Sequence, residues 1–521
     1  MSEFRQPLSC HAAMVARMSL DQDSCWNALE ARDPRFDGRF FTGVHSTGIY
    51  CRPVCPARTP ARRNVEFFRC AAAAEDAGLR PCKRCRPETA PGSSAWLGSS
   101  ATVKRALRLI DSGALETSTC ENLADSLGVG ERQLRRLFLR ELGTTPTNIE
   151  KTRRLHFARK LLVETDLGIA EIAFHAGFGS VRSFNEAVRA AYAVTPTSLR
   201  KKRVSAATGE ITLRLNYRPP MDWASTLAFM TPRLLPGIEI VRDGHWRRAV
   251  TFDDHEFLVD VTADPRRPQL LVRIDSPPPG SLATLVRRVR HVFDLDADLD
   301  AVARVLSADP LLAPSLAMRP GMRVPGAWDL FEVLVRAIVG QQVSVAAATT
   351  VAGRVIDRFG HHPEHLPGFT VFPTPESLAD APLESCGINR ARAEAVRTIS
   401  RAVLDGRIKL DSPGTPAEFE AALVALPGIG PWTARYVCMR GLGEPDAFPD
   451  SDLGLIRAME RAGLPAAPKD LARRAEAWRP WRAYAALHLW ATLGDGLSPA
   501  GKATLPKRKA KGGATTARKK S

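Results

Sequence analysis

The 521-residue chain lacks any long uninterrupted run of apolar residues, and this absence bears on where the protein works. A membrane-spanning helix needs about 20 consecutive apolar residues. The first stretch, MSEFRQPLSCHAAMVARMSL, also lacks the continuous apolar centre of a signal peptide. We therefore expect a cytosolic protein without a membrane partner, in which the ten cysteines are thiols or metal ligands rather than disulfides.

Acidic residues are also in short supply. Aspartate and glutamate number 56 against 73 lysines and arginines, which gives a formal net charge of +17. Such a charge indicates a polyanionic partner, and nucleic acid is the common one because each phosphate contact releases a condensed counterion. A basic protein that is simply soluble is the alternative, so the choice between the two interpretations rests on the sequence motifs.

Composition and periodicity divide the chain into five segments. Residues 20–92 hold two cysteine pairs, and residues 100–203 show the apolar spacing of helices with arginines between. Alternating patterns such as ITLRLNY predict strands over residues 210–285, and residues 286–497 are helical again. The tail, residues 502–521, is basic and poor in apolar residues, so we expect it to be disordered. The predicted fold class is multidomain α+β.

Four cysteines form two closely spaced pairs, Cys51-x3-Cys55 and Cys82-x2-Cys85. Two chelating pairs of thiolates suit tetrahedral Zn²⁺, and a small segment with few large apolar residues gains stability from a bound metal. A purely structural zinc site is one interpretation of this spacing. The remaining cysteines lack paired spacing, and we interpret them as ordinary thiols: Cys10, Cys25, Cys70, Cys120, Cys386 and Cys438.

The residues around these pairs carry a specific resemblance. LEARDPRFDGRFFTGVHSTGIYCRPVCPARTPARRNVEFF and GLRPCKRCRP resemble the N-terminal domain of the Ada family of methylation-response proteins. The resemblance implies that all four cysteines hold one zinc ion, and that Cys51 takes the methyl group from a DNA methylphosphotriester. A zinc-bound thiol is deprotonated at neutral pH and is therefore a ready nucleophile. Methylation removes one negative charge, so nearby arginines would then bind DNA more tightly: Arg52, Arg58, Arg62 and Arg63.

Two stretches of the second segment have the spacing of a helix, a tight turn and a second helix. ENLADSLGVGERQLRRLFLREL places Gly128 at the turn, and IAEIAFHAGFGSVRSFNEAVRAAY places Gly177 there. Together they resemble the AraC-type activator domain, with recognition helices at about Glu131–Leu142 and Val181–Tyr192, each placed in a major groove. A helical bundle without DNA contact is the alternative. The second unit departs from the family pattern at three positions: Glu186, Val188 and Ala193.

The most informative stretch of the C-terminal half is LVALPGIGPWTARYVCMRGLGEPDAFPDSD. Glycines in its turn let backbone N–H groups approach a DNA phosphate closely. With an aspartate at this spacing, the stretch resembles the helix-hairpin-helix base-excision glycosylases. NYRPPMDWASTLAFM, LVRAIVGQQVSVAAATTVAGRV and WRPWRAYAALHLW extend the resemblance to the AlkA-type glycosylases of alkylated bases. The predicted DNA-binding turn comprises Pro427, Gly428, Ile429 and Gly430.

This resemblance implies that Asp452 carries the reaction. Cleavage of an N-glycosidic bond develops positive charge on the sugar, and a fixed carboxylate stabilises that charge while directing a water. A plain helix cap is the alternative for Asp452. Asp450 is a second carboxylate nearby, but alignment from Trp432 and Tyr436 selects Asp452.

Aromatic residues match positions of the AlkA-type base pocket. An aromatic pocket suits alkylated purines, which are electron-deficient or cationic and stack on rings, whereas each ring taken singly fits a hydrophobic core. Gln342 falls where relatives have an apolar wedge that fills the gap left by a flipped base. Trp432 replaces the lysine that forms a Schiff base in bifunctional relatives, so we expect base release without strand nicking. The pocket residues are Phe229, Trp432, Tyr436 and Trp490.

These resemblances together predict a zinc domain, a double helix-turn-helix domain, an AlkA-like antiparallel sheet domain and a helix-hairpin-helix glycosylase domain. The protein would accept methyl groups, activate alkylation-repair genes with RNA polymerase at the nucleoid, and release 3-methyladenine-type bases from double-stranded DNA. We expect zinc and no iron–sulfur cluster, because the cysteine loop for such a cluster is missing. Two alternatives stay open: a damage-targeted glycosylase without a regulatory role, and a regulator whose glycosylase half is inactive. The acceptor motif Pro-Cys-His-Arg of the guanine methyltransferase domain common in Ada proteins is absent.

Overall fold

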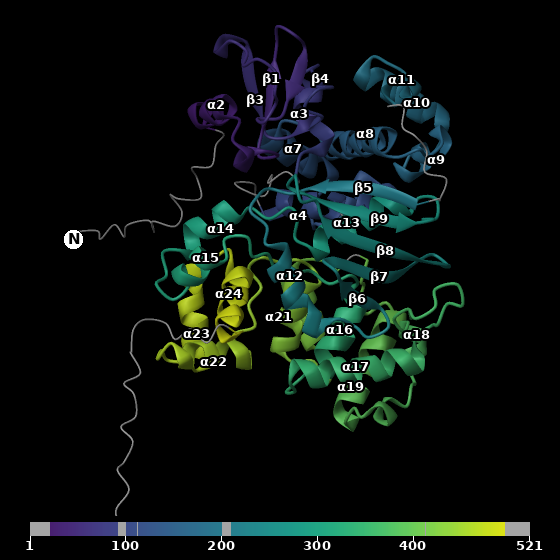
Figure 1. Ribbon diagram of the computed structural model, residues 1–521, viewed down its shortest axis with the longest axis vertical. Helices are drawn as coiled ribbons and strands as arrows, with labels where there is room; N and C mark the ends of the chain where they lie inside the picture. The colour runs from purple at the N-terminus through teal and green to yellow at the C-terminus, as the bar shows by residue number, and fades with distance from the viewer. Residues whose placement is uncertain (1–20, 92–100, 112, 201–209, 412, 495–521) are drawn as a thin grey trace, which may run out of the picture.

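The computed structural model describes residues 21–91, 101–111, 113–200, 210–411 and 413–494. The predicted tail and Cys10 lie outside these residues. The described part is multidomain α+β, as the sequence predicts, with a small sheet at one end, a larger sheet in the middle and a group of helices at the far end (Figure 1). None of the helices in these ranges has both the length and the apolar character required to cross a bilayer.

The N-terminal part is built on a four-stranded sheet of order β3-β1-β2-β4. Its strands are β1 (Phe41–Val44), β2 (Ile49–Cys51), β3 (Val65–Phe68) and β4 (Arg80–Pro81). Its helices are α2 (Gln22–Ala31) and α3 (Ala71–Asp76), with short 3-10 turns η1 (Pro34–Phe36), η2 (Arg62–Asn64) and η3 (Pro87–Thr89). β2 and β4 pair in parallel with Tyr50 opposite Pro81, so the residues that follow, Cys51 and Cys82, are brought side by side.

The second part is entirely helical. Its helices are α4 (Ala101–Asp111), α5 (Ala114–Thr117), α6 (Cys120–Ser126), α7 (Glu131–Leu142), α8 (Pro146–Glu164), α9 (Ile169–His175), α10 (Val181–Tyr192) and α11 (Pro196–Leu199). Helices are confirmed at both positions predicted for recognition helices, as α7 and α10. Gly128 and Gly177 have φ of +67° and +78°, a backbone conformation that glycine adopts without steric cost, so both turns are where the sequence predicts them.

The third part is a five-stranded antiparallel sheet of order β5-β9-β8-β7-β6. Its strands are β5 (Glu210–Asn216), β6 (Glu239–Arg242), β7 (His245–Phe252), β8 (His255–Ala263) and β9 (Gln269–Asp275). Alternate residues of β5, among them Leu213 and Leu215, are buried, which is the period-two pattern of a half-covered strand. Helices α12 (Trp223–Met230) and α13 (Ser281–Val292) and the turn η4 (Thr231–Arg233) accompany the sheet. The predicted domain boundary at residue 285 falls inside α13, which packs against the sheet on both sides of that residue through Leu282 and Val289.

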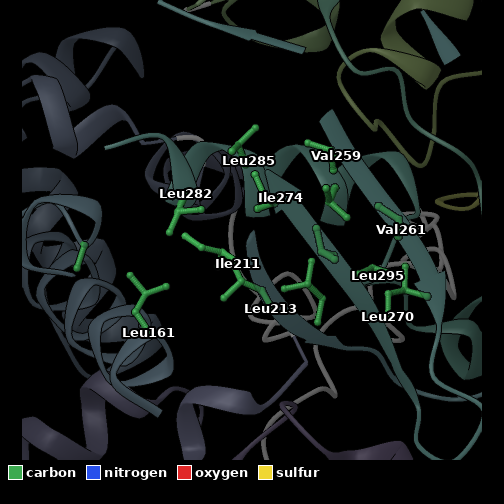
Figure 2. Packing of buried hydrophobic residues seen from close by; sticks show 14 of the residues in the cluster. Leu161, Ile211, Leu213, Val259, Val261, Leu270, Ile274, Leu282, Leu285 and Leu295 are labelled. Carbon is green, nitrogen blue, oxygen red and sulfur yellow. The ribbon is translucent and has the colours of Figure 1, made fainter. Parts of the chain in front are cut away.

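The sheet and the second helix-turn-helix unit share one hydrophobic core. Leu161 of α8 belongs to the same buried cluster as Ile211, Leu213 and Leu282 (Figure 2). Phe184 of α10 is a member of this cluster too. The first helix-turn-helix unit has a separate core, around Leu134 and Phe138. The two units are therefore attached to the rest of the chain in different ways.

The C-terminal part is helical. Its helices are α14 (Leu299–Leu306), α15 (Ala313–Met318), α16 (Leu330–Val339), α17 (Val345–Phe359), α18 (Pro375–Leu378), α19 (Arg390–Leu404), α20 (Pro416–Val424), α21 (Pro431–Arg440), α22 (Leu453–Arg461), α23 (Pro468–Ala475) and α24 (Arg482–Gly494), with 3-10 turns η5 (Leu383–Cys386) and η6 (Glu476–Trp478). Two apolar clusters stabilise it, one around α16, α19 and α21 and one around α22 and α24.

Ion pairs join the first helix-turn-helix unit to the C-terminal half. Arg105 pairs with Glu418 at 3.2 Å and Arg108 with Glu444 at 2.5 Å. A cavity of 1220 Å³ is lined by residues of all the parts described above, among them Arg105, Arg108 and Glu444. Ion pairs therefore join the first helix-turn-helix unit to the C-terminal half, whereas a shared apolar core joins the second unit to the sheet.

Candidate functional site

The four predicted zinc ligands meet at the end of the small sheet. The sulfur atoms of Cys51, Cys55, Cys82 and Cys85 all lie within 4.8 Å of one another. Zn–S bonds of about 2.3 Å in a tetrahedron place sulfurs just under ~4 Å apart, so the cluster fits one zinc ion. Cys51 is partly exposed and the other three are buried, so Cys51 is the most accessible of the four.

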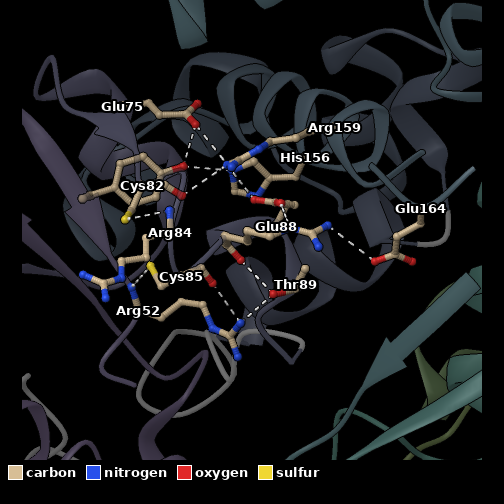
Figure 3. Close-up of polar contacts among 12 residues, drawn as sticks. Arg52, Glu75, Cys82, Arg84, Cys85, Glu88, Thr89, His156, Arg159 and Glu164 are labelled. Carbon is tan, nitrogen blue, oxygen red and sulfur yellow. Dashed lines mark hydrogen bonds and ion pairs between the residues drawn. The ribbon is translucent and has the colours of Figure 1, made fainter. Parts of the chain in front are cut away.

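Backbone donors support the cluster. The N–H of Arg52 donates to Sγ of Cys85 at 3.4 Å, and the N–H of Arg84 donates to Sγ of Cys82 at 3.4 Å (Figure 3). The pKa of Cys51 is raised because its thiol shares hydrogen bonds with the three other sulfurs and because it is buried. Sulfurs this close cannot all carry negative charge without a cation among them. A Zn²⁺ site is therefore what this donor set provides.

Arg52 differs from the other predicted DNA-binding arginines. Its Nε donates to Asp37 at 2.8 Å, and one Nη donates to the carbonyl of Cys85 at 3.1 Å and to Thr89 at 2.5 Å. With only 12% of its side chain exposed, Arg52 holds the cysteine loop together rather than offering its charge to DNA. The sequence does not show this, because Asp37 and Thr89 lie far from Arg52 along the chain.

The three other arginines of this group are exposed. Arg58 and Arg63 lie open to solvent, and Arg62 pairs with Asp23 and lies 5.6 Å from the centre of the Trp26 ring. Their positions keep the predicted contact with phosphate available.

The recognition helices present different charges. α7 exposes four arginines: Arg132, Arg135, Arg136 and Arg140. In α10 the exposed Arg182 is paired with Glu186 at 3.0 Å, and Val188 is buried in the shared core. Arg140 is itself paired with Glu141 at 2.9 Å, and α10 also exposes Arg189, but α7 still exposes more arginines than α10.

The predicted hairpin lies between α20 and α21. Pro427 and Gly428 are exposed, while the side chain of Ile429 is buried and fixes the turn. A Cβ at Gly428, whose φ is +85°, would lie 2.6 Å from Cβ of Ala395, so only glycine fits there. Gly430 then caps the N-terminus of α21, where free backbone N–H groups suit an anion.

Asp452 contacts two of the predicted site residues, Trp432 and Trp490. Its Oδ2 accepts the indole N–H of Trp432 at 3.0 Å, and its Oδ1 accepts that of Trp490 at 2.8 Å. Oδ1 also accepts the N–H of Leu455 at 3.0 Å, so Asp452 caps α22 as well. The carboxylate thereby has a fixed position between two aromatic rings.

Asp450 is engaged elsewhere. Its Oδ1 accepts from Arg435 at 2.7 Å. Gly454 is a site residue that the sequence did not indicate, because a Cβ there would lie 2.9 Å from both Oδ1 of Asp452 and a ring carbon of Trp490. Only the lack of a side chain at this position allows the aspartate and the indole to meet.

The rings and the wedge position come from separate elements. Trp432 and Tyr436 stack at 5.3 Å with an interplanar angle of 13°, one helical turn apart on α21. Phe229 comes from α12, and its ring lies 5.8 Å from the guanidinium of Arg440, which in turn donates to Tyr436. Gln342, predicted as the wedge, is exposed with φ of +55°. Its neighbour Gln341 donates to the carbonyl of Gly428, which ties this loop to the hairpin.

Known families match the parts in the order in which the fold presents them. The metal binding domain of Ada matches residues 24–88, and a helix-turn-helix domain matches residues 123–202. The AlkA N-terminal domain matches residues 212–329, and the HhH-GPD superfamily of base excision DNA repair proteins matches residues 335–483. Fold and sites thus define a class: a helix-hairpin-helix base-excision protein joined to an Ada-type zinc domain and a helix-turn-helix domain.

One relative extends over nearly the whole chain. The Mycobacterium tuberculosis protein named "Probable bifunctional transcriptional activator/DNA repair enzyme AlkA" is 40% identical over 91% of this chain and 97% of its own length. DNA-3-methyladenine glycosylase 2 of Escherichia coli is 35% identical over 54% of this chain and 97% of its own. The bifunctional transcriptional activator/DNA repair enzyme Ada of Escherichia coli is 37% identical over 32% of this chain and 45% of its own. The chain belongs to the family of bifunctional transcriptional activator/DNA repair proteins that join an Ada-type to an AlkA-type half.

Proposed function

We propose that the protein takes methyl groups from DNA methylphosphotriesters on Cys51, thereby activates transcription of alkylation-repair genes, and releases 3-methyladenine-type bases from DNA. The observation that carries the glycosylase half is the position of Asp452, whose two oxygens are held by Trp432 and Trp490. The names of the relatives agree with both halves.

Base release follows from this geometry. As the bond between the sugar and the base breaks, its electron pair passes to the base and positive charge develops on the sugar, where Asp452 stabilises it. A water then adds to the anomeric carbon, and its proton passes to Asp452 or to solvent. Trp432 has no amine that could form a Schiff base, so the product is an intact strand with an abasic site.

Methyl transfer would use Cys51, the least buried of the four clustered cysteines. Sγ of Cys51 attacks the methyl carbon, the C–O bond breaks, and its electron pair stays on the phosphate, which leaves a thioether and an ordinary phosphodiester. Zinc, when bound, keeps the sulfurs as thiolates at neutral pH. The exposed Arg58 and Arg63 would attract the DNA backbone.

Activation would follow from the change in charge. A zinc ion with four thiolates carries a formal charge of minus two, and methylation of Cys51 removes one negative charge. The arginines near the cluster and those of α7 would then bind promoter DNA more tightly, with RNA polymerase as the expected partner. A regulatory role is the part that separates this proposal from a damage-targeted glycosylase.

One preparation tests both activities. Purified protein is incubated with duplex DNA that contains 3-methyladenine, and free base and strand breaks are measured separately before alkali treatment. The same protein is incubated with methylphosphotriester DNA, and peptides around residue 51 are examined by mass spectrometry. We expect free base without nicking and a gain of one methyl group on Cys51. Absence of base release, or methylation at another cysteine, would contradict the corresponding half of the proposal.

A further inference from the structure

The N-terminal part, residues 21–91, packs along α8, the helix that joins the two helix-turn-helix units. Its helix α3 and its turn η3 both contact α8. At the middle of this contact the carboxylate of Glu75 accepts from the hydroxyl of Tyr50 at 2.8 Å and from that of Thr152, on α8, at 2.6 Å. Tyr50 is buried and directly precedes Cys51 on β2. The strand that carries the proposed methyl acceptor is therefore bonded to α8 through one carboxylate.

One end of this contact holds the end of the first recognition helix. Asp76, the last residue of α3, accepts from the hydroxyl of Thr144, in the turn after α7, at 2.5 Å. Its other oxygen accepts from the amide of Asn148, in the first turn of α8, at 2.8 Å. The thiol of Cys70, a weak donor, lies 3.9 Å from the carbonyl oxygen of Leu142, the last residue of α7. α7 therefore ends against α3.

The apolar cores meet at the same place. Ile149 of α8 packs against the buried cluster of the first unit, around Leu134 and Phe138. It also packs against the buried cluster of the N-terminal part, around Tyr50 and Phe68. The hydrogen bonds to Asp76 therefore lie beside an apolar contact between the two parts.

The far end of α8 holds the end of the second recognition helix. The guanidinium of Arg159 lies 5.1 Å from the centre of the ring of Tyr192, the last residue of α10. The same guanidinium donates to the carbonyl of Cys82 at 3.3 Å and to Glu88 at 2.9 Å, both in the N-terminal part (Figure 3). Strand β4, which immediately precedes Cys82, contacts α10 directly. Arg159 and Tyr192 are both buried, so this end is closed to solvent.

The N-terminal part thus contacts the ends of both recognition helices. α8 has 19 residues and is about 28 Å long, and a single helix that joins two units leaves each unit free to swing about its own contact. Further contacts at both ends remove that freedom. Successive turns of the major groove recur every ~34 Å of DNA, so two recognition helices in a fixed arrangement match one separation of their DNA sites.

We infer that the N-terminal part fixes the spacing of α7 and α10, so that the protein recognises two DNA sites at one separation, and that Asp76 is the positioning residue at the α7 end. The inference rests on the proposed regulatory function and adds how the promoter is read. It requires no change of charge at Cys51, so it acts beside the electrostatic effect of methylation.

The first measurement needs no DNA. Zinc-loaded, full-length protein carries two spin labels on a non-natural amino acid, at the exposed positions of Arg136 on α7 and Arg189 on α10, so that the native cysteines stay unlabelled. Pulsed electron resonance gives the distribution of distances between the labels. We expect one narrow distribution with wild-type Asp76, and a broad or shifted one in Asp76→Ala, which removes both hydrogen bonds.

Two further variants serve as controls for this measurement. Asp76→Asn keeps an acceptor oxygen for Thr144 and should keep the narrow distribution. Asp166→Ala removes an exposed carboxylate between α8 and α9 and should leave the distribution unchanged. Zinc content is measured for every variant, so that an effect of lost metal is separated from an effect of the lost contact.

The second measurement uses DNA. The probe is the duplex of about 30 base pairs, nearly three turns, that the wild-type protein methylated on Cys51 selects from a random pool. A second duplex has one base pair inserted between the two protected halves, which moves them apart by about 3.4 Å and turns them by about 35°. The wild type should bind the inserted duplex about tenfold or more weakly, whereas Asp76→Ala should bind the two duplexes within about threefold of each other.

An unchanged distance distribution in Asp76→Ala would show that α8 alone sets the spacing, and would overturn the inference. Equal affinity of the wild type for the two duplexes would overturn it as well. Selection of no sequence by the methylated wild type would reject the proposed regulatory function, and the distance measurement would then decide whether the N-terminal part fixes the two helices.

Discussion

At the scale of single residues, the two proposed reactive groups are positioned in contrasting ways. Asp452 is held by indole and backbone donors that fix both oxygens. Cys51 is held by its membership in a cluster of four sulfurs. Each arrangement places one reactive atom at a partly exposed position, and each can be broken by a single substitution.

The first prediction concerns Asp452→Asn. The amide keeps the shape of the carboxylate but loses the charge that faces the developing sugar cation, so base release should fall by about 100- to 1,000-fold. DNA binding should persist, because the hairpin at Gly428 is not altered. The measurement is single-turnover release of 3-methyladenine together with a binding titration. Asp450→Asn is the control, since Asp450 pairs with Arg435, and its activity should stay within a few fold of wild type. Undiminished release by Asp452→Asn would refute the catalytic assignment.

The second prediction concerns the metal. Native protein should contain one zinc ion per chain, and Cys82→Ala should lose it together with the fold of the small sheet, because the binding energy of a structural zinc is folding energy. Elemental analysis and proteolysis of the N-terminal part provide the measurement. Cys120→Ser, at a partly exposed thiol outside the cluster, should keep the zinc. Full zinc content in Cys82→Ala would show that the assignment of ligands is incorrect.

At the scale of secondary-structure elements, local sequence signals determine most of what could be predicted. α7 and α10 begin and end at the predicted residues because glycine turns and apolar spacing mark them. The boundary between the sheet region and the C-terminal helices could not be predicted in this way. The sequence of α13 resembles that of the helices that follow it, and only tertiary packing shows that α13 belongs with the sheet. The contact between Arg440 and Tyr436 could have been predicted from the sequence, since residues four apart on one helix lie on the same face.

The third prediction concerns the end of α10. Ala193 has φ of +55°, a left-handed conformation that costs a residue with a side chain about 1–2 kcal/mol. Ala193→Gly should therefore stabilise α10 by about 1 kcal/mol after allowing for the greater freedom of glycine in the unfolded chain. Ala190→Gly, an exposed position inside the same helix, should instead cost about 1 kcal/mol. Amide hydrogen exchange in α10 measures both, and destabilisation by both changes would contradict the prediction.

At the scale of the whole molecule, α8 connects three parts. Arg159 of α8 donates to the carbonyl of the zinc ligand Cys82 at 3.3 Å and pairs with Glu88 at 2.9 Å (Figure 3). Leu161 of the same helix lies in the core that the sheet provides. The sequence could not predict this role, because the partners of α8 are tens of residues away and its buried charges resemble those of an exposed helix. The cluster of four cysteines could be predicted because a short motif carries it, and the role of Asp452, which also rests on a short motif, stays a prediction.

The fourth prediction tests the shared core. Leu161→Ala should cost about 2–5 kcal/mol and lower the protection of both α10 and β5 in hydrogen exchange, because both pack on the same cluster. Leu134→Ala makes the same change in the core of the first unit, and its effect should stay within α4, α6 and α7. Loss of protection in α10 alone after Leu161→Ala would show that α10 and β5 do not share one core.

The common core of α10 and the sheet has a consequence for how much DNA one molecule can survey. Two domains on a flexible linker reach a range of distances, and their effective concentration falls gradually with separation. A continuous core allows one separation and one orientation. A molecule bound to a promoter through α10 would therefore present its excision site at a single spacing and a single rotational phase along the same duplex. Lesions elsewhere would fall to other copies, so the number of molecules, rather than the mobility of each, would set how much of the genome is repaired while promoters are occupied.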